Sequence, residues 1–422
     1  MTGAQAADLP VKAKPVQYVK ICSLYGAGFY YIPGTDTCIK IGGFVRAEVN
    51  FNAGGSFAIV GGATKTVNFD SRDDNTQNWR TRAGITADAR SQTAYGTLRG
   101  YVYLSATDTN STGLATGDGT GASAYNALYA PAGFIQFAGF TAGKTGSFFD
   151  FDGQPYSNQS NVWSSNNGGN GIQVFAYTAQ LGNGLSASIS AENQAGRRLG
   201  LGGAGVAYGR QELPDVVGNL RIDQAWGSAQ VMAAYHEVVP NQAFAGGSDD
   251  GYALGLGLKV NLPMLGAKDY IQGQFTYGKG AMHYVGSGLG TGFGGITSGG
   301  TTAVGPAFDA VAVGTSLDLT TGWSITGGYE HFWVPNLKTS LHGAYGELDY
   351  SDAAGVVLGG AGQNADWSFW TVGSRTVWTP VTNLDLSVEV MYNDLQSAFT
   401  GAAISDKSWW SGMFRAQRNF WP

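Results

Sequence analysis

Apolar and polar residues alternate along most of this chain. Between residues 39 and 51 the odd positions are mainly apolar, whereas the even positions include Lys40 and Arg46. Segments 79–90 and 383–392 alternate in the same way. A period of two residues is typical of a β-strand with one apolar and one polar face, and helical periodicity is almost absent. The pattern therefore predicts an all-β protein.

Sixteen such segments follow one another, joined by connections that are alternately long and short. The predicted strands are residues 39–51, 78–90, 95–107, 132–138, 140–146, 171–180, 184–194, 215–226, 228–239, 251–261, 268–279, 321–334, 337–350, 367–378, 383–396 and 407–420. This signature is typical of a transmembrane β-barrel, which has short periplasmic turns and long outer loops. A seventeenth candidate, residues 308–319, would put the termini on opposite sides, so we assign it to the long loop 280–320. The prediction is a sixteen-stranded antiparallel barrel.

A soluble β-helix or a set of β-sandwiches is the alternative interpretation of the same strands. Sandwich turns need not alternate in length along the whole chain, and no repeat of fixed length indicates a solenoid or propeller. Aromatic residues toward the strand ends favour the membrane barrel, because they could form its interfacial girdles, although they are also good strand formers. These residues are Trp333, Trp370, Trp378, Tyr392, Trp410 and Phe420.

Composition supports the barrel and excludes several other classes. Of 422 residues, 66 are Gly and only 13 % are charged, about half the usual ~25 %. A lipid-facing exterior explains the low charge. The scattered Pro excludes collagen, and the lack of a long apolar run excludes a helical membrane protein. A net charge of −6 leaves no basic surplus for binding nucleic acid.

The N-terminal region carries two signs of export. Ala4-Gln5-Ala6 matches a signal-peptidase site, so residues 1–6 are interpreted as a remnant of a signal peptide or an artificial leader, and residues 7–422 as one barrel domain. Cys22 and Cys38 form either a disulfide, worth ~3 kcal/mol in the chain-entropy model, or a pair of unpaired buried thiols. Both features fit an oxidising compartment.

Four segments resemble one family. YVKICSLYGAGFYYIPGTDTCIKIGGFVRAEV (Tyr18–Val49) strongly resembles the start of alphaproteobacterial trimeric porins, and GSFFDF (Gly146–Phe151) resembles the beginning of their constriction loop. Gly328–Glu347 and Phe414–Phe420 match as well. The resemblance covers nearly the whole chain and implies a homotrimer of sixteen-stranded barrels in the outer membrane of a Gram-negative bacterium, in contact with lipid and lipopolysaccharide. It also implies passive diffusion of small hydrophilic solutes and ions.

The resemblance further implies that the third loop, about residues 147–170, folds into the lumen and narrows it. Barrels of this family end in an aromatic residue that serves as the barrel-end signal, and Phe420 matches it best. This chain departs from the pattern because it continues with Trp421-Pro422. That departure puts recognition by the insertion machinery in question.

If the apolar faces contact lipid, the polar faces line a water-filled pore. The basic residues expected in the lumen are Lys40, Arg46, Arg80, Arg82, Arg90 and Arg99. Asp150 and Asp152 of the third loop would face them across the lumen, with Glu48 in the wall, and opposed charges in a narrow channel create a strong transverse field. Two alternatives stay open. The arginines could pair with Glu48 and Asp88, and the two loop aspartates could hold the loop through backbone hydrogen bonds.

Enzyme motifs are weak or missing. No GxSxG or HExxH motif occurs, the four His residues have no ligand spacing, and GxGxxG at Gly200–Gly205 and Gly290–Gly295 is expected by chance in a Gly-rich chain. Asp70, Asp73 and Asp74 could bind a divalent cation, but an acidic surface loop is the simpler interpretation. We therefore expect no catalytic site, metal or cofactor. A receptor or adhesin barrel and a specific-uptake channel are the other functions considered.

Overall fold

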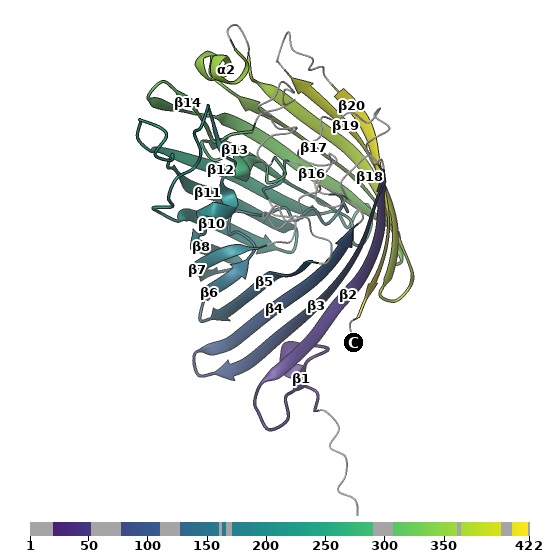
Figure 1. The fold of residues 1–422 in the computed structure, drawn as a ribbon. Coiled ribbons are helices and arrows are strands. Elements are labelled where there is room, and N and C mark those ends of the chain that lie inside the picture. The colour runs from purple at the N-terminus through teal and green to yellow at the C-terminus, as the bar shows by residue number, and fades with distance from the viewer. Residues whose placement is uncertain are drawn as a thin grey trace, which may run out of the picture.

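The fold is a closed antiparallel β-barrel (Figure 1). The computed structural model describes residues 20–51, 77–109, 127–159, 163–165, 171–289, 307–360, 364–397 and 407–420. One sheet contains seventeen strands, of which β1 (Tyr30–Tyr31) is a two-residue addition at one end of the barrel. The other sixteen pair in chain order, and the last pairs with the first, so the predicted sixteen-stranded barrel is confirmed.

The barrel strands agree with the predicted segments, mostly to within a few residues. They are β2 (Cys38–Phe51), β3 (Gln77–Thr93), β4 (Gly96–Thr109), β5 (Ala127–Phe137), β6 (Phe140–Thr145), β7 (Ile172–Gly182), β8 (Leu185–Glu192), β10 (Asp215–Gln224), β11 (Gly227–Val238), β12 (Asp249–Asn261), β13 (Tyr270–Lys279), β16 (Thr321–Val334), β17 (Leu337–Asp349), β18 (Trp367–Val381), β19 (Leu384–Ser397) and β20 (Lys407–Asn419). The largest difference is β5, which begins five residues before the predicted start.

Residues 308–319 lie outside the barrel, as predicted. They form a hairpin of β14 (Ala310–Val313) and β15 (Ser316–Leu319), and β14 pairs with β9 (Leu201–Gly202) in a separate three-stranded sheet. Short helices lie among the same outer loops: η2 (Gln194–Arg197), α1 (Met282–Val285) and α2 (Asp352–Gly359). No helix among the described residues is long and apolar enough to cross a membrane.

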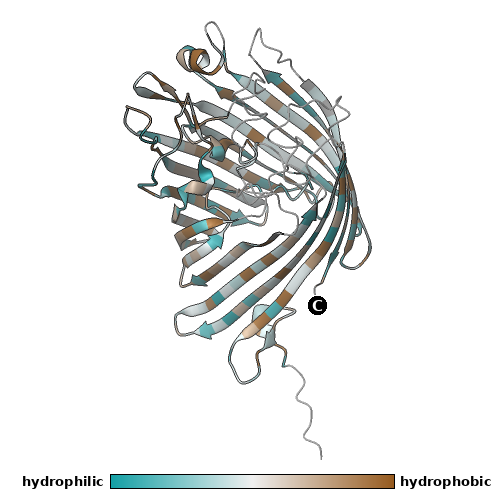
Figure 2. Cartoon of the chain, viewed as in Figure 1, coloured by the Kyte–Doolittle hydropathy of each residue, from teal (hydrophilic) through white to brown (hydrophobic). Residues whose placement is uncertain are grey.

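Burial along the strands is the reverse of that in a soluble protein. On β12, Leu254, Leu256 and Leu258 are each about half exposed, whereas Gln272 and Gln274 on neighbouring β13 are buried. Bands of different hydropathy alternate along the strands in Figure 2. Exposed leucines outside and buried amides inside fit a barrel surrounded by lipid, and they exclude the soluble sandwich with its hydrated outer face.

Both ends of the described chain lie against the first half of β2. The Cys22–Cys38 disulfide is present, and β1 pairs with the first residues of β2. η1 (Ser23–Tyr25) lies in the segment between them. The Phe420 amide donates to the Gly43 carbonyl oxygen at 2.9 Å, and its ring lies so close to Gly43 that a Cβ there would clash with it. Residues 1–19 and Trp421-Pro422 lie outside the described part of the chain.

Candidate functional site: the third loop and the pore wall

The third loop crosses the interior of the barrel. It leaves β6, and its described residues bind inward-facing side chains from β8 to β20, which we call the loop-bound wall. Ser147 Oγ donates to Glu192 of β8 at 2.7 Å, and the Phe151 and Asp152 amides donate to Gln274 of β13 at 3.0 and 3.1 Å. These contacts hold the described residues of the loop against the inside of the barrel wall, which is consistent with the predicted inward fold.

Aromatic side chains of the loop lie directly on glycines of this wall. The Tyr156 ring covers Gly328 of β16, and the Trp163 ring covers Gly346 of β17, each so closely that a Cβ on the glycine would come within 2.5 Å. Phe151 covers Gly257 of β12 more closely still. Any larger residue would push the ring away from the strand. Part of the high glycine content thus provides the space in which the loop packs.

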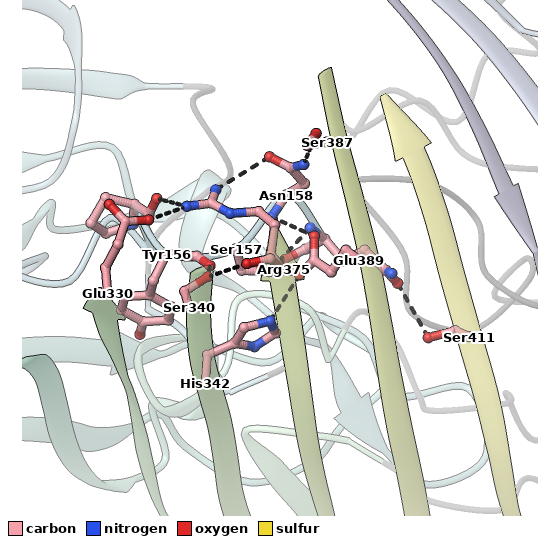
Figure 3. Close-up of polar contacts among 12 residues, drawn as sticks. Tyr156, Ser157, Asn158, Glu330, Ser340, His342, Arg375, Ser387, Glu389 and Ser411 are labelled. Carbon is pink, nitrogen blue, oxygen red and sulfur yellow. Dashed lines mark hydrogen bonds and ion pairs between the residues drawn. The ribbon is translucent and has the colours of Figure 1, made fainter. Parts of the chain in front are cut away.

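Asn158 joins the loop to β18, β19 and β20, and Figure 3 shows its contacts with Arg375 and Ser387. Its amide donates to Glu389 at 2.7 Å, and its side-chain nitrogen donates to Ser387, also at 2.7 Å. Its side-chain oxygen accepts from Arg415 at 2.8 Å and from Arg375 at 3.3 Å, and its carbonyl oxygen accepts from Arg415 at 2.9 Å. One uncharged residue, Asn158, therefore accepts hydrogen bonds from two guanidinium groups and donates one to a carboxylate.

Charged side chains of alternating sign extend on both sides of Asn158. On one side, Arg375 pairs with Glu330 at 2.6 Å, and Lys338 binds the same carboxylate at 2.9 Å. On the other side, Arg415 binds Glu48 of β2 at 2.9 Å, and Arg80 also pairs with Glu48. Breaking one buried pair leaves its partner charged and desolvated, so each of these partners is costly to remove. These residues form a belt of ion pairs around the inside of the barrel.

Asp150 and Asp152 do not face the predicted basic wall, and this part of the sequence interpretation is wrong. Asp150 lies 3.3 Å from the buried Arg197 of η2, and burial raises the pKa of Asp150 to about 6. Asp152 accepts from the Gln154 amide at 2.9 Å and from Gln272 at 3.0 Å, and burial also raises its pKa. Both carboxylates hold the loop in place. The alternative of loop-holding aspartates describes the structure better.

The predicted basic residues lie on the inward faces of β2–β5, which we call the arginine wall. They form two groups at different heights. In the register of β2 and β3, Glu48 is opposite Arg80 and Arg46 is opposite Arg82, whereas Arg90 lies eight residues further along β3, or ~26 Å at the usual rise of a strand. The single cluster expected from the sequence is therefore two clusters.

The upper group consists of Arg46, Arg80 and Arg82, with Arg415 and Glu48 beside it. Arg46 Nε donates to Gln417 at 2.7 Å, and Arg82 Nε donates to Thr107 at 3.0 Å. The pairing with Glu48 expected from the sequence is present for Arg80.

The lower group is centred on Asp88, close to the periplasmic end. Arg90 and Arg99 each bind both Asp88 carboxylate oxygens, at distances between 2.7 and 3.0 Å. Lys40 is opposite Asp88 in the strand register. Lys40 and Arg99 are therefore separated from the upper group and do not belong to the same narrow level of the pore.

Comparison with known proteins identifies the family. A sequence model of the porin subfamily matches residues 8–420. The chain belongs to this family of porins. Omp2b porins of Brucella suis biovar 1 and Brucella abortus (strain 2308) are 33 % and 31 % identical to it over 248 and 246 residues. Each alignment covers 57 % of this chain and 64 % of the relative, so the chain spans just under two thirds of the curated relatives it matches.

A solved structure shares the fold of this porin. The outer membrane channel DcaP of Acinetobacter baumannii superposes with a TM-score of 0.70 at 16 % identity, covering 92 % of this chain and 99 % of that one. At this identity the likeness concerns the fold alone. The family and its Brucella relatives place the porin in the outer membrane of a Gram-negative, alphaproteobacterial cell.

Several residues that hold the third loop of this porin were not predicted from the sequence. Arg375 and Glu389 fall on the polar faces of predicted strands, so the alternation that found Arg46 could also have found them. Asn158 and Arg197 lie in irregular segments without periodicity, and no sequence signal distinguishes them from other loop residues. Among the described residues, no three His, Cys, Asp or Glu side chains are grouped so that they could hold a metal ion. Asp70, Asp73 and Asp74 lie outside the described part.

Proposed function

We propose that this porin forms a water-filled channel through which small hydrophilic solutes and ions diffuse passively across the outer membrane. The observation that carries the proposal is the position of the third loop. Gln274, Glu389 and Arg415 of the loop-bound wall bind it, and in this position the loop would narrow the lumen on the side of the arginine wall. A receptor barrel whose lumen is closed would not need charged and polar side chains on the wall that faces the third loop.

The charges of the upper arginine group support a basic constriction at the level of that group. Arg46, Arg80, Arg82 and Arg415 gather around the carboxylate of Glu48, and Glu389 also attracts Arg415. Between residues 147 and 170 the only charged residues are Asp150 and Asp152, which are bound elsewhere. Low-dielectric walls strengthen the potential of such a group. We therefore propose a constriction that favours anions, with Glu48 in place of an acidic loop as the opposing charge.

The outer surface supports a homotrimer. β6 has six residues and would span ~20 Å along its own direction, less than the ~25 Å apolar band of an outer-membrane barrel. Its outward Phe140 and the outward Phe175 of β7 are exposed. Contact with two further copies would cover this low part of the wall, and lipid and lipopolysaccharide would cover the rest.

Planar-bilayer recordings of the purified porin test these proposals together. We expect stepwise conductance increments in groups of three and a reversal potential displaced toward anions. Arg46→Gln combined with Arg82→Gln should shift that potential toward cations. Arg210→Gln combined with Lys268→Gln, which also removes two positive charges, both from exposed connections, is the matched control and should leave the potential unchanged. Silent membranes would overturn the channel, and an unchanged potential in the double variant would overturn the constriction.

A further inference from the structure

Aromatic rings fill the space between the two arginine groups on the arginine wall. Phe44, Tyr101, Tyr103 and Phe134 are half-buried, and their strand neighbours on the opposite face, such as Val102, are exposed toward lipid. On β2, Phe44 lies two residues from Arg46, on the side toward Asp88. In the strand register, Tyr101 lies opposite Asp88, and Phe134 lies opposite Tyr101. The rings therefore face the lumen and do not belong to the girdles at the membrane interfaces.

The backbone beneath the upper rings is free of side chains. Phe44 and Tyr103 reach over Gly84 from the two neighbouring strands, and a Cβ at Gly84 would lie 2.7 Å from one ring and 2.8 Å from the other. Their ring centroids are 6.3 Å apart. Lower down, the rings of Tyr101 and Phe134 stack at 5.1 Å. These two ring pairs form what we call the aromatic strip, with Phe44 and Tyr103 above and with Tyr101 and Phe134 below, beside Asp88.

Guanidinium groups lie on the faces of these rings at both ends of the strip. Arg46 is 5.0 Å from the Phe44 ring centroid, and Arg99 is 5.2 Å from the centroids of both Tyr101 and Phe134. Cation–π contact at this distance holds each guanidinium beside a ring. The negative charge of Asp88 neutralises one of the two lower arginine charges, and that of Glu48 neutralises part of the charge of the upper group. Both ends of the strip therefore keep a net positive charge.

We propose that this strip is a low-affinity binding path for organic anions that carry a planar ring. The carboxylate or phosphate of the solute binds the arginines, since a guanidinium offers two parallel donors to such a group. The ring of the solute stacks on the rings of Phe44 and Tyr103. The Phe44 ring centroid lies 5.0 Å from the Arg46 guanidinium, so one benzoate ion can reach both the charge and the rings. Arginines at the lower end then accept the anion as it moves on.

The proposal deepens the channel function and rests on it. It differs from a general anion preference because it requires the rings as well as the charges. Aromatic side chains that only fill the wall would treat a planar ring and a saturated ring alike. Stacking distinguishes them, because offset stacking needs a flat π face on both partners.

Reversal potentials in planar bilayers provide the test. Sodium benzoate is compared with sodium cyclohexanecarboxylate, which has the same charge and a similar size but a saturated ring. We expect benzoate to be about threefold more permeant in the unmodified porin. Phe44→Leu with Tyr103→Leu should reduce the ratio to about one while chloride conductance is retained. Tyr95→Leu, on an exposed periplasmic turn, is the matched control and should keep the full ratio.

The outcomes separate this proposal from the channel itself. Equal permeability of the two anions in the unmodified porin overturns the aromatic path, whether or not the double variant inserts into the membrane. A ratio unchanged by the leucine substitutions also overturns it. Loss of chloride conductance in the unmodified porin would contradict the proposed function instead.

Discussion

The loop-bound wall and the arginine wall are built from strands with the same alternating pattern, but they use their charges differently. On the loop-bound wall, Arg375 and Glu389 are buried against Asn158 of the third loop. On the arginine wall, Arg90 and Arg99 stay about a quarter exposed and share one carboxylate. Similar charged side chains thus fix a loop on one side and line the water-filled space on the other. The difference lies in where the partner is, because Asn158 belongs to the third loop, whereas Asp88 belongs to the wall itself.

Loss of the Asn158 side chain should have the largest effect on stability, because it removes the partner that distinguishes the loop-bound wall from the arginine wall. Asn158→Leu removes the acceptor shared by Arg375 and Arg415 and the donor to Ser387. Two buried guanidinium groups lose a partner, so we expect the free energy of unfolding in detergent to fall by about 4 kcal/mol. The loop should also leave the wall more often, which raises single-channel conductance and its noise.

Asn336→Ala is the matched control for Asn158→Leu. Asn336 is exposed on a periplasmic turn, and its substitution should change neither stability nor conductance. Equal behaviour of the two variants would contradict the role of Asn158 in holding the loop.

Titration of Asp150 should give the next largest effect. Because burial raises its pKa from 3.8 to about 6, the folded chain binds a proton between these pH values that the unfolded chain has released. The contribution of Asp150 to the free energy of unfolding therefore decreases as pH rises from about 4 to about 6, by up to ~3 kcal/mol, and is constant above pH 6.

Comparison with Asp150→Asn isolates this contribution. The variant has no group to titrate, so its stability relative to the unmodified porin should increase across the same pH window. Denaturant unfolding at several pH values from 4 to 7 measures the difference. A difference independent of pH would show that Asp150 does not carry the raised pKa.

The strands of both walls could be predicted from the sequence because lipid on one side and water on the other impose a strict period of two. β5 was predicted too short, since Pro131 lies within it and its pairing with β4 is irregular between Tyr103 and Ser105. The partners of Asp150 and Asp152 could not be predicted. Arg197 and Gln272 are distant along the chain, and an irregular loop carries no period that indicates which wall it will contact.

The smallest expected effect comes from adding one methyl group to each wall. Gly346→Ala places a Cβ 2.5 Å from the Trp163 ring, so the loop must shift, and we expect a loss of about 2 kcal/mol in the free energy of unfolding. Gly100→Ala on β4 is the matched substitution, because nothing lies within 4 Å of its Cβ. It should be neutral in denaturant unfolding. If the two alanines cost the same, the glycines of the loop-bound wall do not serve to admit the aromatic side chains of the third loop, and polar contacts such as those of Asn158 and Gln274 must hold the loop across the pore.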